Sequence, residues 1–399
     1  MDAIIKTIPG QKPTNLDRRI KRHVIGERHS FFAVAFPGYE ELCRRELEGL
    51  ESPPALDPPV TGGVAFSGRL ADLYRANLHL RTAGRVLLRL ADFKATGFGR
   101  LEKQVRELAW SLYLPPGGIP RIHVTTRHSR LYHTRAVAQR IGESLAGHWS
   151  DLGIAPAPGQ EQALYARLVD DRLTLSLDSS GPNLYRRGLK THAVRAPLRE
   201  TLAVLILRIA GYRPDLPLVD PMCGAGTFSL EAALIAKSIP PGLYRRFAFM
   251  QWPAFRPAQW NHLCKTAASR IKTLDHPVIR ASDIDGPACE KLARCVAQNG
   301  FEDAIRVDSR NFFSLLPGDV ADRPGLIVLN PPFGRRLRPD AALVDLYRDI
   351  ALKLRRDFNG WRAALLVPDR RLAHSLNLPF RAYKLGHGGL ELTLLTGRL

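Results

Sequence analysis

The first half of the chain alternates short apolar runs with segments that have helical spacing. The runs FFAVAF (31–36), GGVAFSG (62–68) and RVLLRLADF (85–93) have the length and apolar content of strands. Between them, GYEELCRRELEGL (38–50) and LADLYRANLHL (70–80) place their leucines on one side of a helix. This order of strand, helix, strand, helix and strand predicts a small α+β unit over residues 29–95.

Residues 96–180 predict a second α+β segment, with helices over 101–112 and 133–149 and a strand at RIHVTT (121–126). Two alternating runs flank Asp170 and Asp171, which predicts a hairpin with these aspartates at its turn. Residues 1–28 are polar and basic without a period, and we expect a mobile tail there. Residues 181–196 combine Gly, Pro and cations without an apolar period, and they predict a linker.

From residue 197 the pattern changes to buried strands that alternate with longer helices. A helix is expected from Pro197 to Gly211, followed by helices over 227–237, 287–299 and 341–358. The strands are LPLVD (216–220), PVIRASDID (277–285), AIRVDS (304–309), GLIVLN (325–330) and RAALLVP (362–368). This order predicts an α/β fold with a doubly wound parallel sheet over residues 197–399. The last two strands, 380–386 and 390–397, are expected to pair as a hairpin that forms an antiparallel edge.

Composition narrows the class of protein. The 399 residues exceed what one core usually holds, and 45% are hydrophobic, as in folded domains. There is no apolar run of about 18 residues and no secretory signal, so a cytoplasmic protein without a membrane partner is expected. The five cysteines show no CxxC spacing, so neither a zinc site nor a disulfide framework is indicated, and we expect no metal.

The formal net charge of +20 is the strongest compositional signal. Such an excess favours binding to phosphate backbones, although an arginine-rich proteome would also produce it.

The first strand of the second half ends in a candidate cofactor turn, DPMCGAGT (220–227). Two glycines before a helix fit a dinucleotide site, but Ser229 stands where the third glycine would be. A carboxylate at Asp220 would repel a pyrophosphate and would attract a cation. S-adenosylmethionine carries an ammonium and a sulfonium, so the turn predicts that cofactor. Its predicted contacts here are Asp220, Cys223, Gly224, Gly226 and Thr227.

Further acids lie at the next two strand ends. Asp283 is placed to accept both ribose hydroxyls, while Asp285 either does so instead or caps the following helix. Asp308 is a candidate acceptor for the adenine amino group. Because the carboxyl ends of parallel strands share one edge, we expect these acids on the ligand side of the sheet.

The fourth strand ends in NPPFG (330–334), which predicts an amine clamp. The lone pair of a purine amine is delocalised into the ring, so the amine is a poor nucleophile. The Asn330 side-chain oxygen and the Pro331 carbonyl can hold both amine hydrogens and favour a pyramidal nitrogen. Pro332 lacks a backbone donor and helps to fix the chain, and Phe333 can stack on the base.

Arginines supply candidate RNA contacts. Some follow the amine clamp, some lie in RIHVTTRHSRLYHTRAVAQR (121–140), and two lie in the linker, where they could close on either the cofactor or the RNA. The alternative for the second group is a solvated helix face. The candidates are Arg127, Arg130, Arg135, Arg186, Arg187, Arg335, Arg336 and Arg338.

DPMCGAGT, SDID and NPPFG, in this order, resemble the motifs of class I S-adenosylmethionine-dependent methyltransferases that modify amines. With RANLHLRTAGRVLLRL (75–90) and YRRGLKTHAVRAPLRETLA (185–203), the chain is similar over about residues 30–399 to bacterial THUMP-containing N2-guanine RNA methyltransferases. The likeness is to the N-terminal half of the 23S rRNA enzyme. It implies that residues 29–95 are a ferredoxin-like segment and 96–180 a THUMP domain, both binding RNA. It also implies a Rossmann-like methyltransferase domain, with catalysis at Asn330–Phe333.

One spacing departs from a dinucleotide fold, because 63 residues (283 − 220) separate Asp220 from Asp283. The segment SIPPGLYRRFAFMQWPAFRPAQWNHL (238–263) fills this interval, and the rRNA-type relatives carry a similar insertion. The expected activity is methylation of a guanine N2 amine in 23S rRNA, without the second catalytic half of the fused enzyme. The alternatives are a tRNA guanine, an adenine N6 amine, a glutamine side chain, or a catalytically silent RNA-binding or ribosome-assembly factor.

Overall fold

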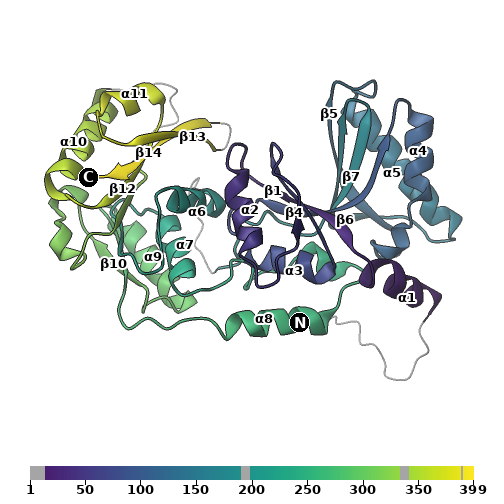
Figure 1. Ribbon diagram of the computed structural model, residues 1–399, viewed down its shortest axis with the longest axis horizontal. Helices are drawn as coiled ribbons and strands as arrows, with labels where there is room; N and C mark the ends of the chain where they lie inside the picture. The colour runs from purple at the N-terminus through teal and green to yellow at the C-terminus, as the bar shows by residue number, and fades with distance from the viewer. Residues whose placement is uncertain (1–13, 190–197, 333–340, 388–389) are drawn as a thin grey trace. The chain divides into compact units, whose positions relative to one another are not determined.

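The computed structural model describes residues 14–189, 198–332, 341–387 and 390–399. The chain divides into two compact units (Figure 1). The first consists of Met1–Leu184 with Arg246–Leu263, and the second of Tyr185–Arg245 with Cys264–Leu399. The first unit therefore ends inside the predicted linker and takes part of the predicted insertion. No helix in the described ranges has the length and hydropathy needed to cross a membrane.

The first unit is built on one seven-stranded sheet with the order β2-β3-β1-β4-β7-β6-β5. All neighbours in it are antiparallel except β5 and β6. Because β4 pairs with both β1 and β7, the sheet continues through both predicted α+β segments, and the division at residues 95/96 stays a prediction. The strands are β1 His29–Val34, β2 Ala55–Leu56, β3 Gly63–Gly68, β4 Arg85–Lys94, β5 Gly118–Arg127, β6 Ala157–Val169 and β7 Arg172–Asp178.

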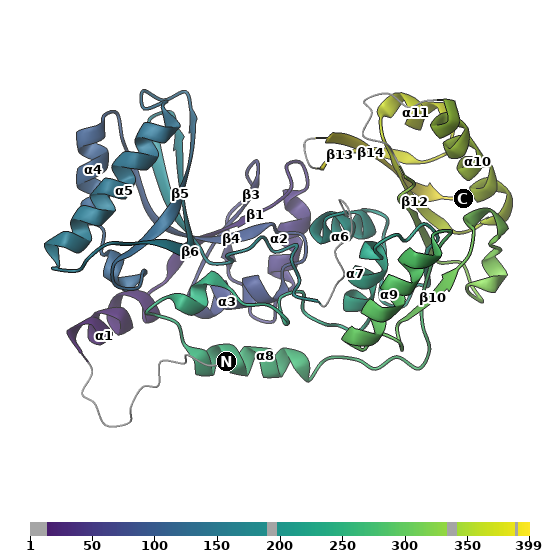
Figure 2. The same ribbon diagram turned by 180° about the vertical axis from the view of Figure 1, so that it is seen from behind.

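The predicted hairpin at Asp170 and Asp171 is confirmed. Val169 pairs with Arg172, and the two aspartates take φ values of 50° and 62°, which a tight two-residue hairpin turn requires. Helices α4 (Phe98–Glu107) and α5 (Thr134–Asp151) lie together against one side of strands β5 to β7 (Figure 2). Helices α2 (Glu40–Glu48) and α3 (Leu70–His79) accompany strands β1, β3 and β4.

The predicted tail of residues 1–28 is wrong over its described part. Helix α1 (Asn15–Ile20) runs into a π-helical turn, Lys21–Ile25. Thr14 caps α1, since its hydroxyl accepts from the backbone of Asp17 while the Asp17 carboxylate accepts from the backbone of Thr14. Ile20 and Val24, four residues apart, are buried and anchor this segment.

The segment Arg246–Leu263 lies between α7 and β9 of the second unit in sequence, yet it packs in the first unit. Phe249, in the short 3-10 helix Ala248–Gln251, stacks on Tyr74 of α3 with ring centroids 4.6 Å apart. Trp260 meets Phe249 edge-on at 5.4 Å, and the Trp252 indole donates a hydrogen bond of 2.9 Å to Gln162. This aromatic cluster anchors the segment; helix α8 (Pro257–Ala268) begins within it.

The second unit contains the predicted doubly wound sheet, with the order β10-β9-β8-β11-β12-β14-β13. The first five strands are parallel neighbours, and β14 runs antiparallel to both β12 and β13. The predicted terminal hairpin is confirmed, although the antiparallel strand lies one place inside the edge. The strands are β8 Leu218–Asp220, β9 Ile279–Asp283, β10 Ile305–Ser309, β11 Leu326–Leu329, β12 Arg362–Val367, β13 Arg381–His387 and β14 Leu390–Arg398.

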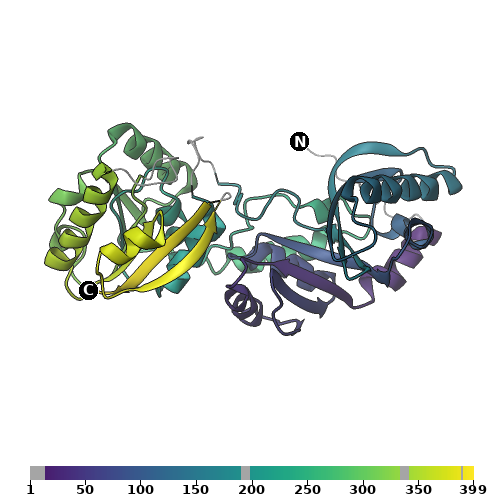
Figure 3. The ribbon, with the colours of Figure 1, turned by 90° about the horizontal axis from the view of Figure 1, so that it is seen from above.

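Helices cover both faces of this sheet (Figure 3). On one side, α10 (Ala341–Asp357) packs on Ile327 and Leu329 of β11 and on Ala363 and Leu365 of β12. The other side carries α6 (Glu200–Ile209), α7 (Thr227–Ala236) and α9 (Gly286–Asn299). The buried apolar strands are thus enclosed on both faces, as their continuous hydrophobic runs require.

Candidate functional site

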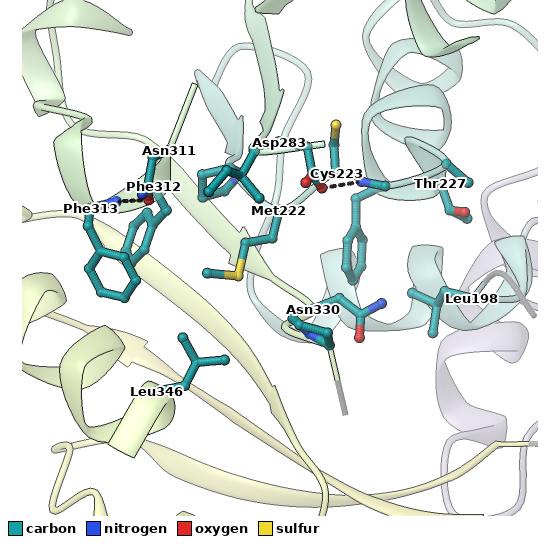
Figure 4. Close-up of a pocket in the computed structure, with 16 residues that line it drawn as sticks. Leu198, Met222, Cys223, Thr227, Asp283, Asn311, Phe312, Phe313, Asn330 and Leu346 are labelled. Carbon is teal, nitrogen blue, oxygen red and sulfur yellow. Dashed lines mark hydrogen bonds between the residues drawn. The ribbon is translucent and has the colours of Figure 1, made fainter. Parts of the chain in front are cut away.

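A cavity of about 450 Å³ lies at the carboxyl ends of strands β8 to β11 in the second unit. Residues that follow all four strands line it, because parallel strands end at the same edge of the sheet. Figure 4 shows Asp283, Asn311 and Asn330 reaching this space from three different strand ends. As predicted, residues at or directly after the ends of β8, β9 and β11 lie together at the cavity. After β10, the residues at the cavity are not the predicted one.

The turn after β8 forms one wall. Gly224, Thr227 and Cys223 line the cavity, and burial raises the pKa of the Cys223 thiol, which keeps it neutral. Gly226 has φ 73° and is the N-cap residue before α7; a Cβ there would lie 2.2 Å from the Leu292 side chain of α9. This glycine therefore serves the backbone turn and the close packing of two helices.

Asp220 lies beneath that wall rather than in it. Its side chain is 1% exposed, and the cavity lining starts at the next residue, Pro221. The Ser229 hydroxyl donates a 2.8 Å hydrogen bond to Oδ2, while Oδ1 is buried without a partner among the described residues. Burial raises the pKa of Asp220 to about 7. The hydrogen bonds from Ser229 oppose this rise, and the Asp283 carboxylate adds to it. Ser229 stands where a dinucleotide-binding turn has its third glycine, and here its hydroxyl donates a hydrogen bond to Asp220.

Asp283 connects the ends of β8 and β9. One oxygen accepts from the Gly224 backbone at 2.9 Å and the other from the Asp285 backbone at 3.0 Å, and the side chain lines the cavity. Asp285 itself caps α9 by accepting from the Ala288 backbone at 3.2 Å. Of the two alternatives for Asp285, the structure shows the cap.

The expected position of Asp308 is wrong. Its carboxylate lies 3.5 Å from Arg306 and lines a separate small cavity, whose other residues include Arg280 and Asp319. Asp308 is not the last residue of β10, and alternation turns its side chain away from the cavity. The chain reaches the cavity only three residues later, with Asn311, Phe312 and Phe313.

Asn330 follows β11 and lines the cavity with Pro332. Its side-chain oxygen is buried and has no hydrogen-bond partner among the described residues. A buried acceptor of this kind carries a desolvation cost unless a ligand satisfies it. Pro331 is buried. Phe333, Arg335, Arg336 and Arg338 lie outside the described residues.

The remaining candidate arginines have different surroundings. Arg127, Arg135 and Arg186 are exposed, and Arg130 is exposed with its guanidinium 3.7 Å from Asp171. The predicted RNA contact of Arg187 is contradicted by its burial. Arg187 is 3% exposed and its Nε donates to Glu231 of α7 at 2.8 Å, because a buried guanidinium requires a carboxylate partner.

Several cavity residues were not predicted from the sequence. Leu198, Met222 and Leu346 contribute apolar surface, and Ile284 and Phe313 expose 75% and 39% of their surfaces at the cavity. An apolar residue directly after a strand-end acid, as at Ile284, is the one local signal that would have indicated such a wall. The others are brought together only by the fold.

Comparisons with known proteins agree with this geometry. Residues 187–394 match the RMKL-like methyltransferase domain, and residues 30–87 match the RlmL ferredoxin-like domain. The chain is 33% identical over 372 residues to slr0064 of Synechocystis sp., provisionally assigned as an RNA methyltransferase; the match covers 92% of this chain and 95% of that one.

Two further proteins extend the comparison. Ribosomal RNA large subunit methyltransferase K/L of Methylococcus capsulatus is 34% identical over 377 residues, 91% of this chain and 50% of the relative, so the chain spans about half of that protein. SMU.472, a provisionally assigned methyltransferase solved with SAH, superimposes with a TM-score of 0.80 at 27% identity, covering 93% of this chain and 98% of that one. The chain therefore belongs to the RMKL-like family of S-adenosylmethionine-dependent methyltransferases.

Proposed function

We propose that this chain methylates the exocyclic N2 amine of a guanine in large-subunit ribosomal RNA. The observation that carries the proposal is the Asn330 side-chain oxygen, which is buried at the cavity without a partner among the described residues. An acceptor held ready in this way suits an amine hydrogen of the substrate.

The cavity also suits the cofactor. Asp283 would accept from the ribose hydroxyls, since its carboxylate lines the cavity between the two strand ends. Ile284 and Phe313 provide exposed apolar surface for a flat adenine ring. Oδ1 of Asp220 has no partner among the described residues, and its charge beneath the cavity wall would favour the cationic end of the molecule. When bound, S-adenosylmethionine supplies the electrophilic methyl group.

The role of the NPP segment is to prepare the amine. The Asn330 oxygen would accept one amine hydrogen and the Pro331 carbonyl the other. Because both hydrogens are then drawn out of the ring plane, the nitrogen becomes pyramidal and its lone pair is available for in-line attack. The nitrogen needs no prior deprotonation, since its proton becomes acidic only after the methyl group has been transferred. Phe333 would stack on the base, as expected from the sequence.

The substrate class rests on relatives and on charge. The relatives include proteins named as ribosomal RNA large subunit methyltransferases and one assigned to RNA in general. A net charge of +20 supports binding to a polyanion. Arg127, Arg135 and Arg186 are exposed and remain proposed RNA contacts.

The test is digestion and mass spectrometry of ribosomal and transfer RNA from a strain that lacks the gene. We expect one N2-methylguanosine to disappear from large-subunit ribosomal RNA and to return with the wild-type gene but not with Asn330→Ala. Unchanged N2-methylguanosine in every RNA fraction would overturn the proposal. Loss from transfer RNA alone would overturn the ribosomal assignment.

A further inference from the structure

Among the described residues, one face of the first unit's sheet is exposed along its β5–β6 edge. Along β5 and β6 exposure alternates, so that Leu164 and Leu168 are buried on the helix side while Arg121, His123 and Arg167 are exposed on the other. The register places His123 beside Tyr165, and Tyr165 beside Ser176 of β7. We infer that this open face binds single-stranded RNA by stacking bases on its aromatic side chains. The inference rests on the proposed function in that the partner is RNA.

The aromatic groups on this face are already stacked. The His123 ring lies nearly parallel to the Tyr165 ring, with centroids 5.0 Å apart and an interplanar angle of 17°. The Arg85 guanidinium lies 5.2 Å from the Tyr165 centroid, and Arg89 lies 4.6 Å from the centroid of Phe32 on β1. Flat rings and guanidinium planes on an open sheet are surfaces on which unpaired bases stack.

The charge of the face suits a polyanion. Arg85 pairs with the buried Asp178, but Arg121 and Arg167 make no ion pair with any described residue. Burial lowers the pKa of Arg89 and nearby Arg167 adds to this, against the opposing effect of Asp92 and Asp57. The guanidinium groups of Arg89 and Arg167 repel each other, and a phosphate bound between them would offset this repulsion.

The state of His123 also favours stacking. Burial, with Arg85 and Arg121 nearby, lowers the pKa of His123, so its ring is neutral at pH 7. A neutral ring beside Tyr165 contributes a stacking surface while the arginines supply the charge. Duplex RNA keeps its bases stacked inside the helix and cannot use this surface, so the occupant is single-stranded.

The test measures binding of the full chain to a short single-stranded RNA by fluorescence anisotropy over a range of salt concentrations. Tyr165→Leu and His123→Leu should each weaken binding by about 5- to 150-fold, the range expected for one lost stacking partner. The slope of log affinity against log salt should not change, because no cation is removed. Arg121→Gln should instead reduce that slope by about 0.7, the value for one phosphate contact on a single strand.

Two variants serve as controls. Tyr165→Phe keeps the ring and should keep the affinity, which separates stacking from a general loss of structure. Tyr244→Leu removes a tyrosine of the second unit that is 46% exposed and does not belong to this sheet, and it should bind RNA like the wild type. Unchanged affinity in Tyr165→Leu, or an equal loss for duplex RNA, would overturn the inference.

The stacking face and the proposed function can fail separately. Methyl transfer at saturating RNA should survive Tyr165→Leu, because the residue lies outside the cavity. If the strain lacking the gene loses no N2-methylguanosine while Tyr165→Leu still loses RNA affinity, the proposed function fails and the stacking face stands. If that strain loses N2-methylguanosine while Tyr165→Leu keeps its RNA affinity, only the stacking inference is overturned.

Discussion

Arg187 and Glu231 form an ion pair that is buried on both sides, with Nε and Oε1 2.8 Å apart and side chains 2% and 1% exposed. Arg187 lies two residues after the start of the second unit, and Glu231 lies on α7, the helix that begins with the cofactor turn. The pair therefore fixes the entering chain to the helix that shapes the cavity wall.

Arg187→Ala should destabilise the second unit by about 3–5 kcal/mol, because it leaves the Glu231 carboxylate buried without its partner. Urea denaturation measures the change. Replacing both residues with apolar ones, Arg187→Met with Glu231→Leu, should recover most of the loss. Arg213→Ala is the matched control, since its ion pair with Asp215 is exposed and should contribute about 0–1 kcal/mol.

Asn330→Ala should lower kcat by about 100- to 1000-fold, as removal of one oriented polar group from an active site does. Affinity for RNA should barely move, because the lost contact forms mainly in the transition state. Single-turnover methylation of a guanine-containing RNA measures the rate. Gln298→Ala removes an exposed amide on α9 and should leave the rate unchanged. A normal kcat in Asn330→Ala would mean that the NPP segment is only a structural turn.

Cofactor binding should release a proton near neutral pH. Since the pKa of Asp220 is raised to about 7, this acid is largely protonated at about pH 6, and a cationic ligand beside it favours the carboxylate. Affinity measured by calorimetry should therefore rise from about pH 6 and level off above about pH 7. Asp220→Asn should remove this rise, and a pH-independent affinity in the wild type would contradict the proposed charge attraction.

The same raised pKa predicts how the free protein's stability depends on pH. A raised carboxyl pKa means that the folded state holds a proton that the unfolded state has released, so stability falls as pH rises from about 4 to about 7. Burial raises the pKa of Glu200 to about 7 as well, with the same sign. In thermal melts, the melting temperature of Asp220→Asn should therefore fall less steeply with rising pH than that of the wild type. The fall that remains should come from Glu200.

Gly226→Ala should cost more than Gly224→Ala. Both glycines have positive φ, 73° and 48°, which costs a residue with a side chain about 1–2 kcal/mol. A Cβ at Gly224 meets nothing within 4 Å, whereas at Gly226 it would overlap Leu292. Urea denaturation compares the two variants. Equal losses would mean that the backbone angle alone makes these glycines necessary.

Phe249→Ala should destabilise the first unit by about 3–5 kcal/mol, the usual cost of removing a buried aromatic ring. Phe249 is fully buried between Tyr74, Phe247 and Trp260. Hydrogen exchange should show lost protection in α3. Leu152→Ala, at a position 53% exposed in the same unit, is the control and should have little effect.

The second sheet and its site were predicted from two features, the apolar runs of the strands and the polar residues that follow them. Asp283 and Asn330 were found because each follows a recognisable buried strand, and parallel strands bring their ends together. Asp308 failed because the side that a residue faces depends on its register in the sheet, and Ser309, not Asp308, pairs with Asp283 of β9. A shift of one position in a strand turns the side chain to the opposite face.

Other features depend on partners far away in sequence. The burial of Arg187 could not be predicted, because its carboxylate partner is 44 residues away. Helix α1 and the π-helical turn after it were missed because their buried residues, Ile20 and Val24, make too short an apolar pattern. The segment Arg246–Leu263 was identified from the sequence only as part of an insertion, and its aromatic contacts assign it to the first unit.

That assignment also bears on inheritance. The chain passes between the units at three places, after Leu184, Arg245 and Leu263, so no single cut in the gene separates them. A recombination event that moved the first 184 residues alone would leave Tyr74 without Phe249, and the event's other product would carry an exposed aromatic segment. A gene fragment that keeps both units whole therefore has to span all three crossings.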